Sequence, residues 1–477
     1  MLLGRTPGFS GGIVMAGMVV KNNMSAVNTL NVLNRNANEL TKSLRKVSSG
    51  MRINSAGDDA SGYAIGERMA VQMRSLDQDN RNAQNGNSML KVAEGAVANT
   101  VEIISTLKEK VLNAANDTNT DSDRAQIQKE LDQMVDQIDD NANVTYNGMY
   151  MIDGSHNRTV LTDSAASPGE TGTFTHLTNR NFAANTTGDT DLTELTDSTG
   201  RNLGINDGDT VTISWVCEGK TNIIASQVDS TGLNGPAILY DLFTGVGGEV
   251  IAGDLTDASD ITNFLTVSSY TDRIGTDASG NDVYTPDYQP AITFRAVHSG
   301  LDKQISGLTV SVTNKDGNIN KSANAVLDNF EESIRAENAS PDNAIVLQTG
   351  TKANQAIKVG FSDMRAFSLG LKAKDGTTLN ISTQKFANAA INVLDMALQK
   401  CLNQQTKIGS VESRLEYTSA NLSIASENTQ SSMSTIQDAD MAAEMTAYTK
   451  NNVLLQAAQS MLAQANQNSS SVLSLLQ

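Results

Sequence analysis

The sequence predicts an α+β fold, in which the two ends of the chain form a long antiparallel coiled coil or bundle around a β-rich insert. Residues 8–167 and 342–477 contain none of the six prolines, and long helices exclude proline from their interiors. Tyr63 is the only aromatic residue between positions 18 and 145. Hydrophobic residues make up 39% of the chain but aromatic residues only 4%. This aliphatic content favours thin helical seams over one large core.

The N-terminal part carries three apolar stripes with the spacing of a helix face. The first alternates steps of three and four residues, which is a heptad pattern. Thr120 and Asp123 precede the third stripe and are typical of a capping box at a helix start. The stripes consist of Leu30, Leu33, Ala37, Leu40, Leu44, Val47 and Met51; of Leu90, Ala93, Val97, Val101, Ile104 and Val111; and of Ile127, Leu131, Met134 and Ile138.

The C-terminal part has the same character. One stripe consists of Leu394, Leu398, Cys401, Ile408, Leu415 and Leu422, and the last consists of Leu454, Leu455, Ala458, Met461, Leu462, Ala465, Val472, Leu475 and Leu476. Two interpretations fit such stripes. In the first, the stripes form an ordinary intramolecular bundle. In the second, the two ends of the chain pair with each other and then pack against neighbouring subunits. Periodicity alone does not decide between the two.

The middle of the chain, about residues 155–345, is rich in Gly, Thr, Asp and Ser and holds five of the prolines. Val211, Ile213 and Trp215 alternate with polar residues after the turn-like segment 206–209, which predicts a strand. Segments 292–297 and 308–312 indicate further strands. We expect one or two small β-rich domains here.

Composition excludes several classes of protein. The net charge of -18 argues against nucleic acid, because phosphate binding needs clustered Lys and Arg. No run approaches the ~20 apolar residues of a membrane span. Cys401 lies in a helical apolar pattern and is expected to be a buried free thiol. Neither it nor Cys217 has metal-ligand spacing around it.

No motif for catalysis or for a cofactor is found. The three histidines do not form His-Glu-x-x-His or any helical ligand pair, and no Gly-x-Ser-x-Gly elbow is present. The glycine cluster 245–248 is expected to be a turn. Segment 277–282 lacks the acidic spacing of a calcium loop, so a polar hairpin turn is favoured. We therefore expect a non-enzymatic protein without cofactor or metal.

Several ordered motifs at both ends resemble bacterial flagellins. The segment from Lys46 to Arg68 carries the most specific one, with Ser48, Ser49, Gly50, Arg52, Ile53, Asn54, Asp58 and Asp59 as its signature residues. Segments 80–86, 94–96 and 145–148 continue the likeness, and 361–370, 438–445, 449–452 and 456–466 carry it near the other end. The likeness covers about residues 18–155 and 342–477, and the middle resembles no family.

The resemblance implies an organisation in four parts. Residues 1–17 are expected to be a non-native or unstructured extension, with translation beginning at Met18 or Met15. Residues 18–60 with 436–477 would form the terminal helices of a filament core, and residues 61–155 with 342–435 a helical bundle domain. Residues 156–341 would be the variable β-rich outer part.

The same resemblance implies a structural subunit of the flagellar filament, exported through the type III apparatus without a cleaved signal peptide. Its partners would be further copies of itself, an export chaperone at the C-terminal helix, and hook-associated and cap proteins. A hook–filament junction protein is the main alternative, because it shares similar helical ends. An enzyme-bearing flagellin and a generic coiled-coil scaffold are less favoured.

A further expectation concerns the host Toll-like receptor that senses flagellin. The helix after Glu94 resembles the segment that this receptor contacts. Strongly recognised members have Arg and Leu where this chain has Thr106 and Lys110, whereas Lys108 and Glu109 keep the family's charge types. We expect weak recognition, because an interfacial Arg is lost and a Lys would become buried.

Overall fold

The computed structural model describes residues 23–163, 166, 169–183, 186–217, 219–231, 235–239, 265–268, 273–284, 291–296 and 298–475. The expected extension 1–17 and the glycine cluster 245–248 lie outside these residues. The chain divides into two compact units. The terminal unit contains Met1–Gln78 and Asn421–Gln477, and the central unit contains Asp79–Ala420.

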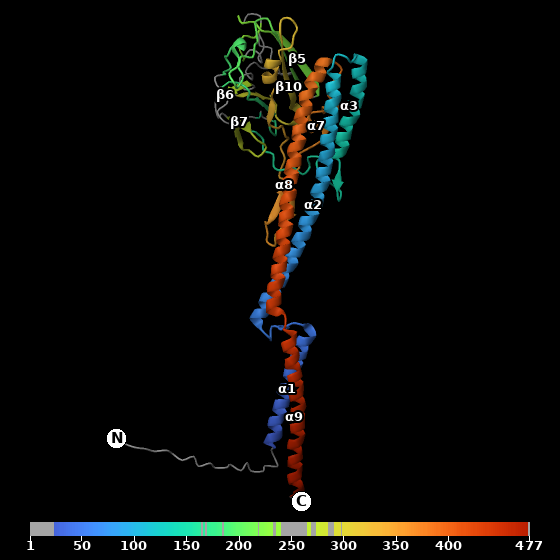
Figure 1. Cartoon of the computed structure of the whole chain (residues 1–477), viewed down its shortest axis with the longest axis vertical. Coiled ribbons are helices and arrows are strands. Elements are labelled where there is room, and N and C mark those ends of the chain that lie inside the picture. The colour runs from blue at the N-terminus through green and yellow to red at the C-terminus, as the bar shows by residue number, and fades with distance from the viewer. Residues whose placement is uncertain are drawn as a thin grey trace, which may run out of the picture. The chain divides into compact units, whose positions relative to one another are not determined.

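The terminal unit is built on an antiparallel pair of helices, α1 (Met24–Ser49) and α9 (Met441–Leu475), which lie side by side in Figure 1. The Asn23 side chain donates to the carbonyl oxygen of Ala465 at 3.2 Å, so the start of α1 lies beside the later part of α9. Asn23 also caps α1, by accepting from the amide of Ala26. Gly50 ends the helix in the left-handed region at φ 71°, where glycine carries no steric penalty.

Helices α2 (Ala60–Ala114) and α8 (Gln384–Gln437) contribute residues to both units. In the central unit they pack with α3 (Asp121–Ala142) and the short α7 (Ala366–Leu369). The predicted capping box is confirmed, because Thr120 and Asp123 exchange both hydrogen bonds at the start of α3. Cys401 is buried and unpaired, as predicted.

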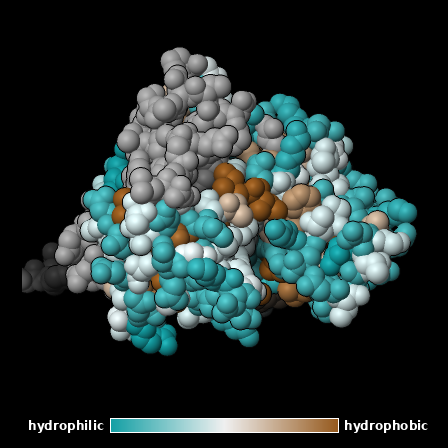
Figure 2. Space-filling view, turned by 90° about the horizontal axis from the view of Figure 1, so that it is seen from above, coloured by the Kyte–Doolittle hydropathy of each residue, from teal (hydrophilic) through white to brown (hydrophobic). Residues whose placement is uncertain are grey.

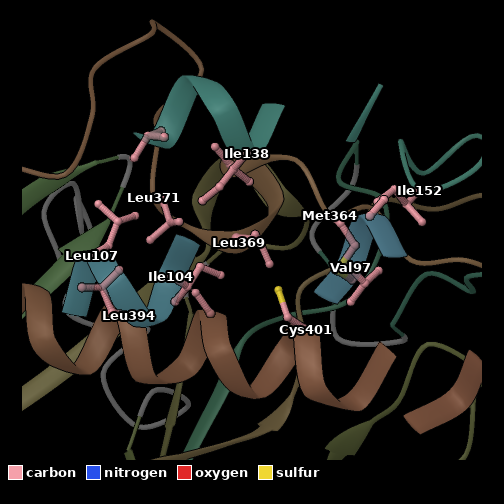
Figure 3. Close-up of a cluster of buried hydrophobic side chains, with 14 of the residues drawn as sticks. Val97, Ile104, Leu107, Ile138, Ile152, Met364, Leu369, Leu371, Leu394 and Cys401 are labelled. Atoms are coloured by element: carbon pink, nitrogen blue, oxygen red, sulfur yellow. The ribbon is translucent and has the colours of Figure 1, made fainter. Parts of the chain in front are cut away.

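The core of these helices contains most of the predicted stripe residues. Figure 3 shows Leu107, Ile138, Leu369, Leu394 and Cys401 pointing toward one another from four helices. The fully or almost fully buried members of the stripes are Leu90, Ala93, Val97, Ile104, Val111, Leu131, Ile138, Leu394, Cys401, Ile408 and Leu415. The helical periodicity was therefore a correct guide to the buried faces.

The middle of the chain is β-rich, as predicted, and its described strands pair antiparallel. A three-stranded sheet has the order β10 (Ile305–Thr313), β4 (Thr210–Cys217), β5 (Lys220–Gln227). A four-stranded sheet has the order β11 (Glu331–Ile334), β3 (His176–Asn179), β9 (Ala291–Arg295), β6 (Leu265–Ser268). Among the described residues, the helices between strands are η1 (Leu192–Glu194), η2 (Leu301–Lys303) and α6 (Lys321–Leu327).

Three hairpins complete the described strands. They are β1 (Thr145–Tyr146) with β2 (Met149–Tyr150), β7 (Arg273–Thr276) with β8 (Asp282–Tyr284), and β12 (Ile345–Gln348) with β13 (Ala356–Val359). The predicted polar turn joins β7 to β8, where the Asp277 carboxylate accepts from the amides of Ser279 and Asn281. Figure 2, seen from above, shows that most of the coloured surface on this face is hydrophilic, with a clear apolar patch near the middle of the view.

The insert has its own core and is joined to α8 within the central unit. Val211, Ile213 and Trp215 of β4 are buried in the insert core, as their alternation predicts. Val216, on the opposite face of the strand, belongs to the helical core. Strand β4 therefore links the two cores.

Buried polar groups fix this joint. The Asn392 side chain of α8 donates to the Leu308 carbonyl at 3.1 Å and to the Asp328 carboxylate at 2.9 Å. Lys400 of α8 is buried and lies 3.0 Å from a carboxylate oxygen of Glu332. Burial lowers the pKa of Lys400, against the opposing charge of Glu332. Such a pair is costly to break, because one partner alone would leave an uncompensated buried charge.

Replacement of Leu107 by alanine tests the helical core. Leu107 is fully buried on α2, whereas Leu112 of the same helix is 50% exposed. We expect Leu107→Ala to lower the free energy of unfolding by about 2–5 kcal/mol and Leu112→Ala to change it by less than about 0.5 kcal/mol. Urea unfolding followed by circular dichroism measures both. Equal effects would contradict the assignment of the core.

A second prediction concerns pH. Burial raises the pKa of Asp328 to about 7, against opposing hydrogen bonds from Val310 and Asn392. The folded state therefore holds a proton that the unfolded state releases near pH 4, so stability falls as pH rises from about 4 to about 7. In Asp328→Asn the loss of unfolding free energy between about pH 4 and pH 7 should be smaller than in the wild type, by an amount on the order of a few kcal/mol.

Denaturant unfolding at a series of pH values, followed by the fluorescence of the buried Trp215, measures this slope. Asp316→Asn, which removes an exposed carboxylate from the same unit, should keep the wild-type slope. An unchanged slope in Asp328→Asn would overturn the prediction.

Candidate functional site

The contact between α1 and α9 follows a heptad on each helix. On α1 a heptad of shielded residues consists of Ala26, Thr29, Leu33, Asn36, Leu40, Ser43 and Val47, and Ala37 and Lys46 beside it are also partly shielded. On α9 the heptad consists of Glu444, Tyr448, Asn451, Leu455, Ala458, Leu462 and Ala465, and Ala447 and Asn452 beside it are also partly shielded. This antiparallel seam includes the predicted residues Leu33, Leu40, Val47, Leu455, Ala458 and Leu462.

Polar residues at the seam hold its register. Ser43 is only 6% exposed, and its hydroxyl accepts from the Asn451 side chain at 3.3 Å. The Asn36 side chain donates to the Leu454 carbonyl at 3.4 Å. A sliding of either helix would break these bonds, and a polar residue at a seam position typically specifies register at some cost in stability. The predicted apolar stripe does not contain these polar residues, although Thr29, Asn36 and Ser43 recur every seven positions.

Four other predicted assembly residues lie away from the seam. Leu30 and Leu44 of α1 are 44% and 51% exposed, and Leu454 and Met461 of α9 are 41% and 62% exposed. Ala37 is half-buried. Further exposed apolar residues of the two helices are Met24, Val27, Val32, Met441, Met445 and Val453. The side chains of Val472 and Leu475, and all of Leu476, lie outside the part of the chain that the structure describes.

The position of these exposed residues matters because they surround α9. Leu454 and Met461 lie on one flank, Val453 and Met445 on other sides, and Leu455 with Leu462 at the seam. A helix that is apolar on several sides is usually buried on several sides. Contiguous exposed apolar surface typically marks a protein contact. The hairpin therefore satisfies only part of its apolar surface within one chain.

The signature segment forms the connection between α1 and α2. The Asp58 carboxylate accepts from the Arg45 guanidinium at 3.0 Å, from the Asn54 amide at 3.2 Å and from the Ser55 hydroxyl at 3.1 Å. Desolvation acts to raise the pKa of Asp58, but these hydrogen bonds and the charge of Arg45 outweigh it and lower that pKa. Asp58 thereby ties together α1, through Arg45, and the connecting segment, through Asn54 and Ser55.

Other signature residues brace the same connection. The Arg52 guanidinium donates to the Ile436 carbonyl at 2.7 Å, at the end of α8. Ile53 is 4% exposed. Asp59 caps the start of α2, because its carboxylate accepts from the amides of Ser61 and Gly62, each at 3.0 Å.

The remaining signature residues lie at the end of α1. Ser48 is exposed, the Ser49 hydroxyl accepts from the Met51 amide at 3.1 Å, and Gly50 makes the left-handed cap described above. Ser49, Gly50, Arg52, Asp58 and Asp59 thus hold the backbone of this connection in place.

The segment singled out as a receptor contact lies on α2 in the central unit. Lys108 forms an ion pair with Asp395 of α8, and Lys110 lies 2.9 Å from Glu130 of α3. The Thr106 hydroxyl donates to the Glu102 carbonyl of its own helix at 3.0 Å, and Glu109 is exposed. Both lysines are therefore engaged by neighbouring helices of the same chain.

The described residues show no group of three or more His, Cys, Asp or Glu side chains that is suited to a metal ion. His176 is buried, and its burial lowers its pKa to about 4, so its imidazole is neutral at pH 7. Among the helices described, none has the length and apolar character needed to cross a membrane.

The fold and the hairpin define a class of protein: a subunit with two helical ends that present apolar surface to a partner. Residues 20–157 match the bacterial flagellin N-terminal helical region, and residues 391–476 match the bacterial flagellin C-terminal helical region. A flagellin of Clostridium tyrobutyricum is 31% identical over 451 residues, which cover 94% of this chain and 99% of the relative. The chain belongs to the bacterial flagellin family.

Other similar proteins carry related names. A B-type flagellin of Pseudomonas aeruginosa is 30% identical over 501 residues, with 96% of this chain and 99% of the relative covered. Among solved structures, flagellar hook associated protein-3 of Legionella pneumophila matches with a TM-score of 0.32 and 15% identity, over 78% of this chain and 98% of that one.

Asp58→Ala tests the role of the signature connection. Loss of this carboxylate removes the acceptor of the Asn54 amide, so hydrogen exchange at Asn54 should become faster at neutral pH. The same amide should lose protection in the wild type when the pH falls through the lowered pKa of Asp58, below the ordinary value of 3.8. Glu39→Ala, which removes an exposed carboxylate of α1, is the control. Equal exchange at Asn54 in Asp58→Ala and the wild type would contradict this role.

Proposed function

We propose that this flagellin is a structural subunit that self-assembles into the bacterial flagellar filament through its terminal hairpin. The observation that supports this most directly is the apolar surface on α1 and α9 that the single chain leaves exposed. Membership of the flagellin family supports the same function, because flagellins are structural proteins. The filament would place the protein outside the cell, on the flagellum.

The energetics favour association of the hairpin with neighbouring subunits. Burying one Leu, Val or Met side chain contributes about 1.5–3 kcal/mol. Leu30, Leu44, Leu454 and Met461 alone thus represent several kcal/mol that the isolated hairpin does not use. Because these residues lie on several sides of the two helices, each subunit would contact more than one neighbour. Contacts that repeat without closing a ring produce a filament.

The proposed organisation assigns residues 18–60 and 436–477 to the filament core. Residues 61–155 and 342–435 would form the surrounding helical domain, and residues 156–341 the outer part. The hydrophilic surface and the net charge of -18 suit an insert that faces solvent. The extension 1–17 remains outside this scheme.

Export without a cleaved signal peptide, a chaperone on the C-terminal helix, and contacts with hook-associated and cap proteins belong to the same proposal. The exposed apolar residues of α9 support a chaperone, since they need protection before assembly. The hook–filament junction alternative is less favoured, because the relatives that cover almost the whole chain are flagellins.

Seeded assembly tests the proposal with a pair of matched variants on α1. Leu30 is 44% exposed and Leu40 is half-buried at the seam. Leu30→Ala should leave the hairpin of the monomer intact but slow filament elongation by roughly tenfold, if one apolar contact of about 1.4 kcal/mol is lost. Leu40→Ala should reduce both the helical content of the monomer and its elongation.

Elongation is followed by electron microscopy and light scattering, and helical content by circular dichroism. A chain lacking residues 436–477 is the negative control. Failure of the full chain to elongate seeds while both ends are folded would favour the junction or scaffold alternative.

We also propose that the flagellin-sensing Toll-like receptor recognises this chain weakly. The segment with Thr106, Lys108, Glu109 and Lys110 supports this, because both lysines are held by Asp395 and Glu130. A receptor that replaced these contacts would have to break them first. Lys110 would also carry its charge into an apolar contact, which is unfavourable without a partner.

A reporter-cell dose response tests this recognition. Thr106→Arg combined with Lys110→Leu should shift the response toward lower concentration by about tenfold or more, because each change concerns about 1–2 kcal/mol at an interface. Lys129→Leu, on an exposed site of α3, should leave the response unchanged. A wild-type response as sensitive as that of a strongly recognised flagellin would refute weak recognition.

A further inference from the structure

The exposed methionines of the described chain gather on the terminal unit. Met461 is 62% exposed, Met24 is 61%, Met445 is 45%, Met441 is 43% and Met51 is 38%. All five lie on α1, on α9 or at the residue that follows the cap of α1. In the central unit Met149 is exposed to a similar degree, at 41%.

The methionines of the central unit are otherwise shielded. Met151 and Met364 are 0% exposed, Met89 is 3% and Met396 is 7%. Met364 points into the helical core (Figure 3). The chain therefore separates its thioethers into a solvent-facing set on the hairpin and a protected set in the cores.

Exposure decides which thioethers an oxidant reaches. The methionine sulfur attacks one oxygen of hydrogen peroxide, so that an S–O bond forms and the O–O bond breaks. Sulfur supplies the two electrons, and the other peroxide oxygen leaves as water after proton transfer. The product, methionine sulfoxide, is a polar side chain in place of an apolar one. On an exposed position this change leaves the fold intact.

We propose that Met24, Met441, Met445 and Met461 of the free subunit are sites of modification by peroxides, and that their oxidation stops the subunit from joining a filament. This inference rests on the proposed function, because it needs the hairpin surface to become buried on assembly. A sulfoxide buried without a hydrogen-bond donor is unfavourable, as for any unpaired polar group. Subunits already in a filament are shielded at the same residues, so oxidation acts on the free subunit.

Positions on α9 explain why three of these residues matter together. Met441 and Met445 stand one helical turn apart on α9, and Met445 borders a shallow depression lined also by Thr449, Val453 and Leu454. Met461 lies about four turns further along the same helix. Oxidation thus places polar groups at both ends of the exposed apolar surface of α9.

The experiment uses the full chain as purified monomer, treated with hydrogen peroxide and then freed of it. Peptide mass spectrometry should find sulfoxide first at Met24, Met441, Met445 and Met461, and last at Met89, Met151, Met364 and Met396. Circular dichroism should be unchanged. Seeded elongation should fall by at least roughly tenfold, as expected when unpaired polar groups enter an apolar contact.

A quadruple variant with Met24, Met441, Met445 and Met461 changed to leucine should elongate seeds before and after peroxide. Met149→Leu is the matched control and should stay as sensitive as the wild type. Methionine sulfoxide reductases should restore elongation of the oxidised wild type. Filaments treated in the same way should acquire sulfoxide at the four positions much more slowly than monomers do.

The outcomes separate the two proposals. If untreated wild type fails to elongate seeds, the proposed function is wrong. If it elongates but oxidised wild type elongates equally well, or the quadruple variant is still inactivated by peroxide, the modification proposal is overturned while the proposed function stands.

Discussion

The antiparallel contact between α1 and α9 is the constraint on which the terminal unit depends. Its seam is narrow and partly polar, since Ser43 and Asn36 occupy positions where an apolar residue would contribute more burial. The pair gains a defined register from these residues but limited stability. Since α1 has 26 residues and α9 has 35, the two helices also present a large surface for one seam to cover. An interaction partner is the physical consequence.

The central unit differs from the terminal unit, because it buries its apolar residues in cores of its own. Strand β4 faces the insert core with Ile213 and Trp215 and the helical core with Val216. Lys400 and Asp328 lie where the insert meets α8, and both have pKa values shifted by burial. Lys400 keeps its ion pair with Glu332, and Asp328 its hydrogen bond from Asn392, only while the insert stays in this position on α8. The insert is therefore held in a defined position on α8, although its surface is free to vary.

Much of the fold could be predicted from local sequence, and the reason is visible in particular residues. The capping box of Thr120 depends only on Asp123, three positions away, and the alternation around Ile213 depends only on its neighbours. The sheet order β10, β4, β5 could not be predicted, because β10 starts about 90 residues after β4 and nothing local specifies that pairing. The bracing role of Asp58 was equally hidden, since its partner Arg45 belongs to the preceding helix.

The candidate site shows the same limit more sharply. One continuous stripe in the sequence contains Leu30, Leu33, Ala37, Leu40 and Leu44. In the structure Leu33 and Leu40 face α9, whereas Leu30 and Leu44 face solvent. Apolar residues that recur at steps of both three and four residues make a stripe that is wider than one antiparallel partner helix can cover. The excess width is itself informative, because selection for a stable isolated hairpin would place polar residues there. Apolar residues on the uncovered flank are explained by a contact that one chain cannot make alone.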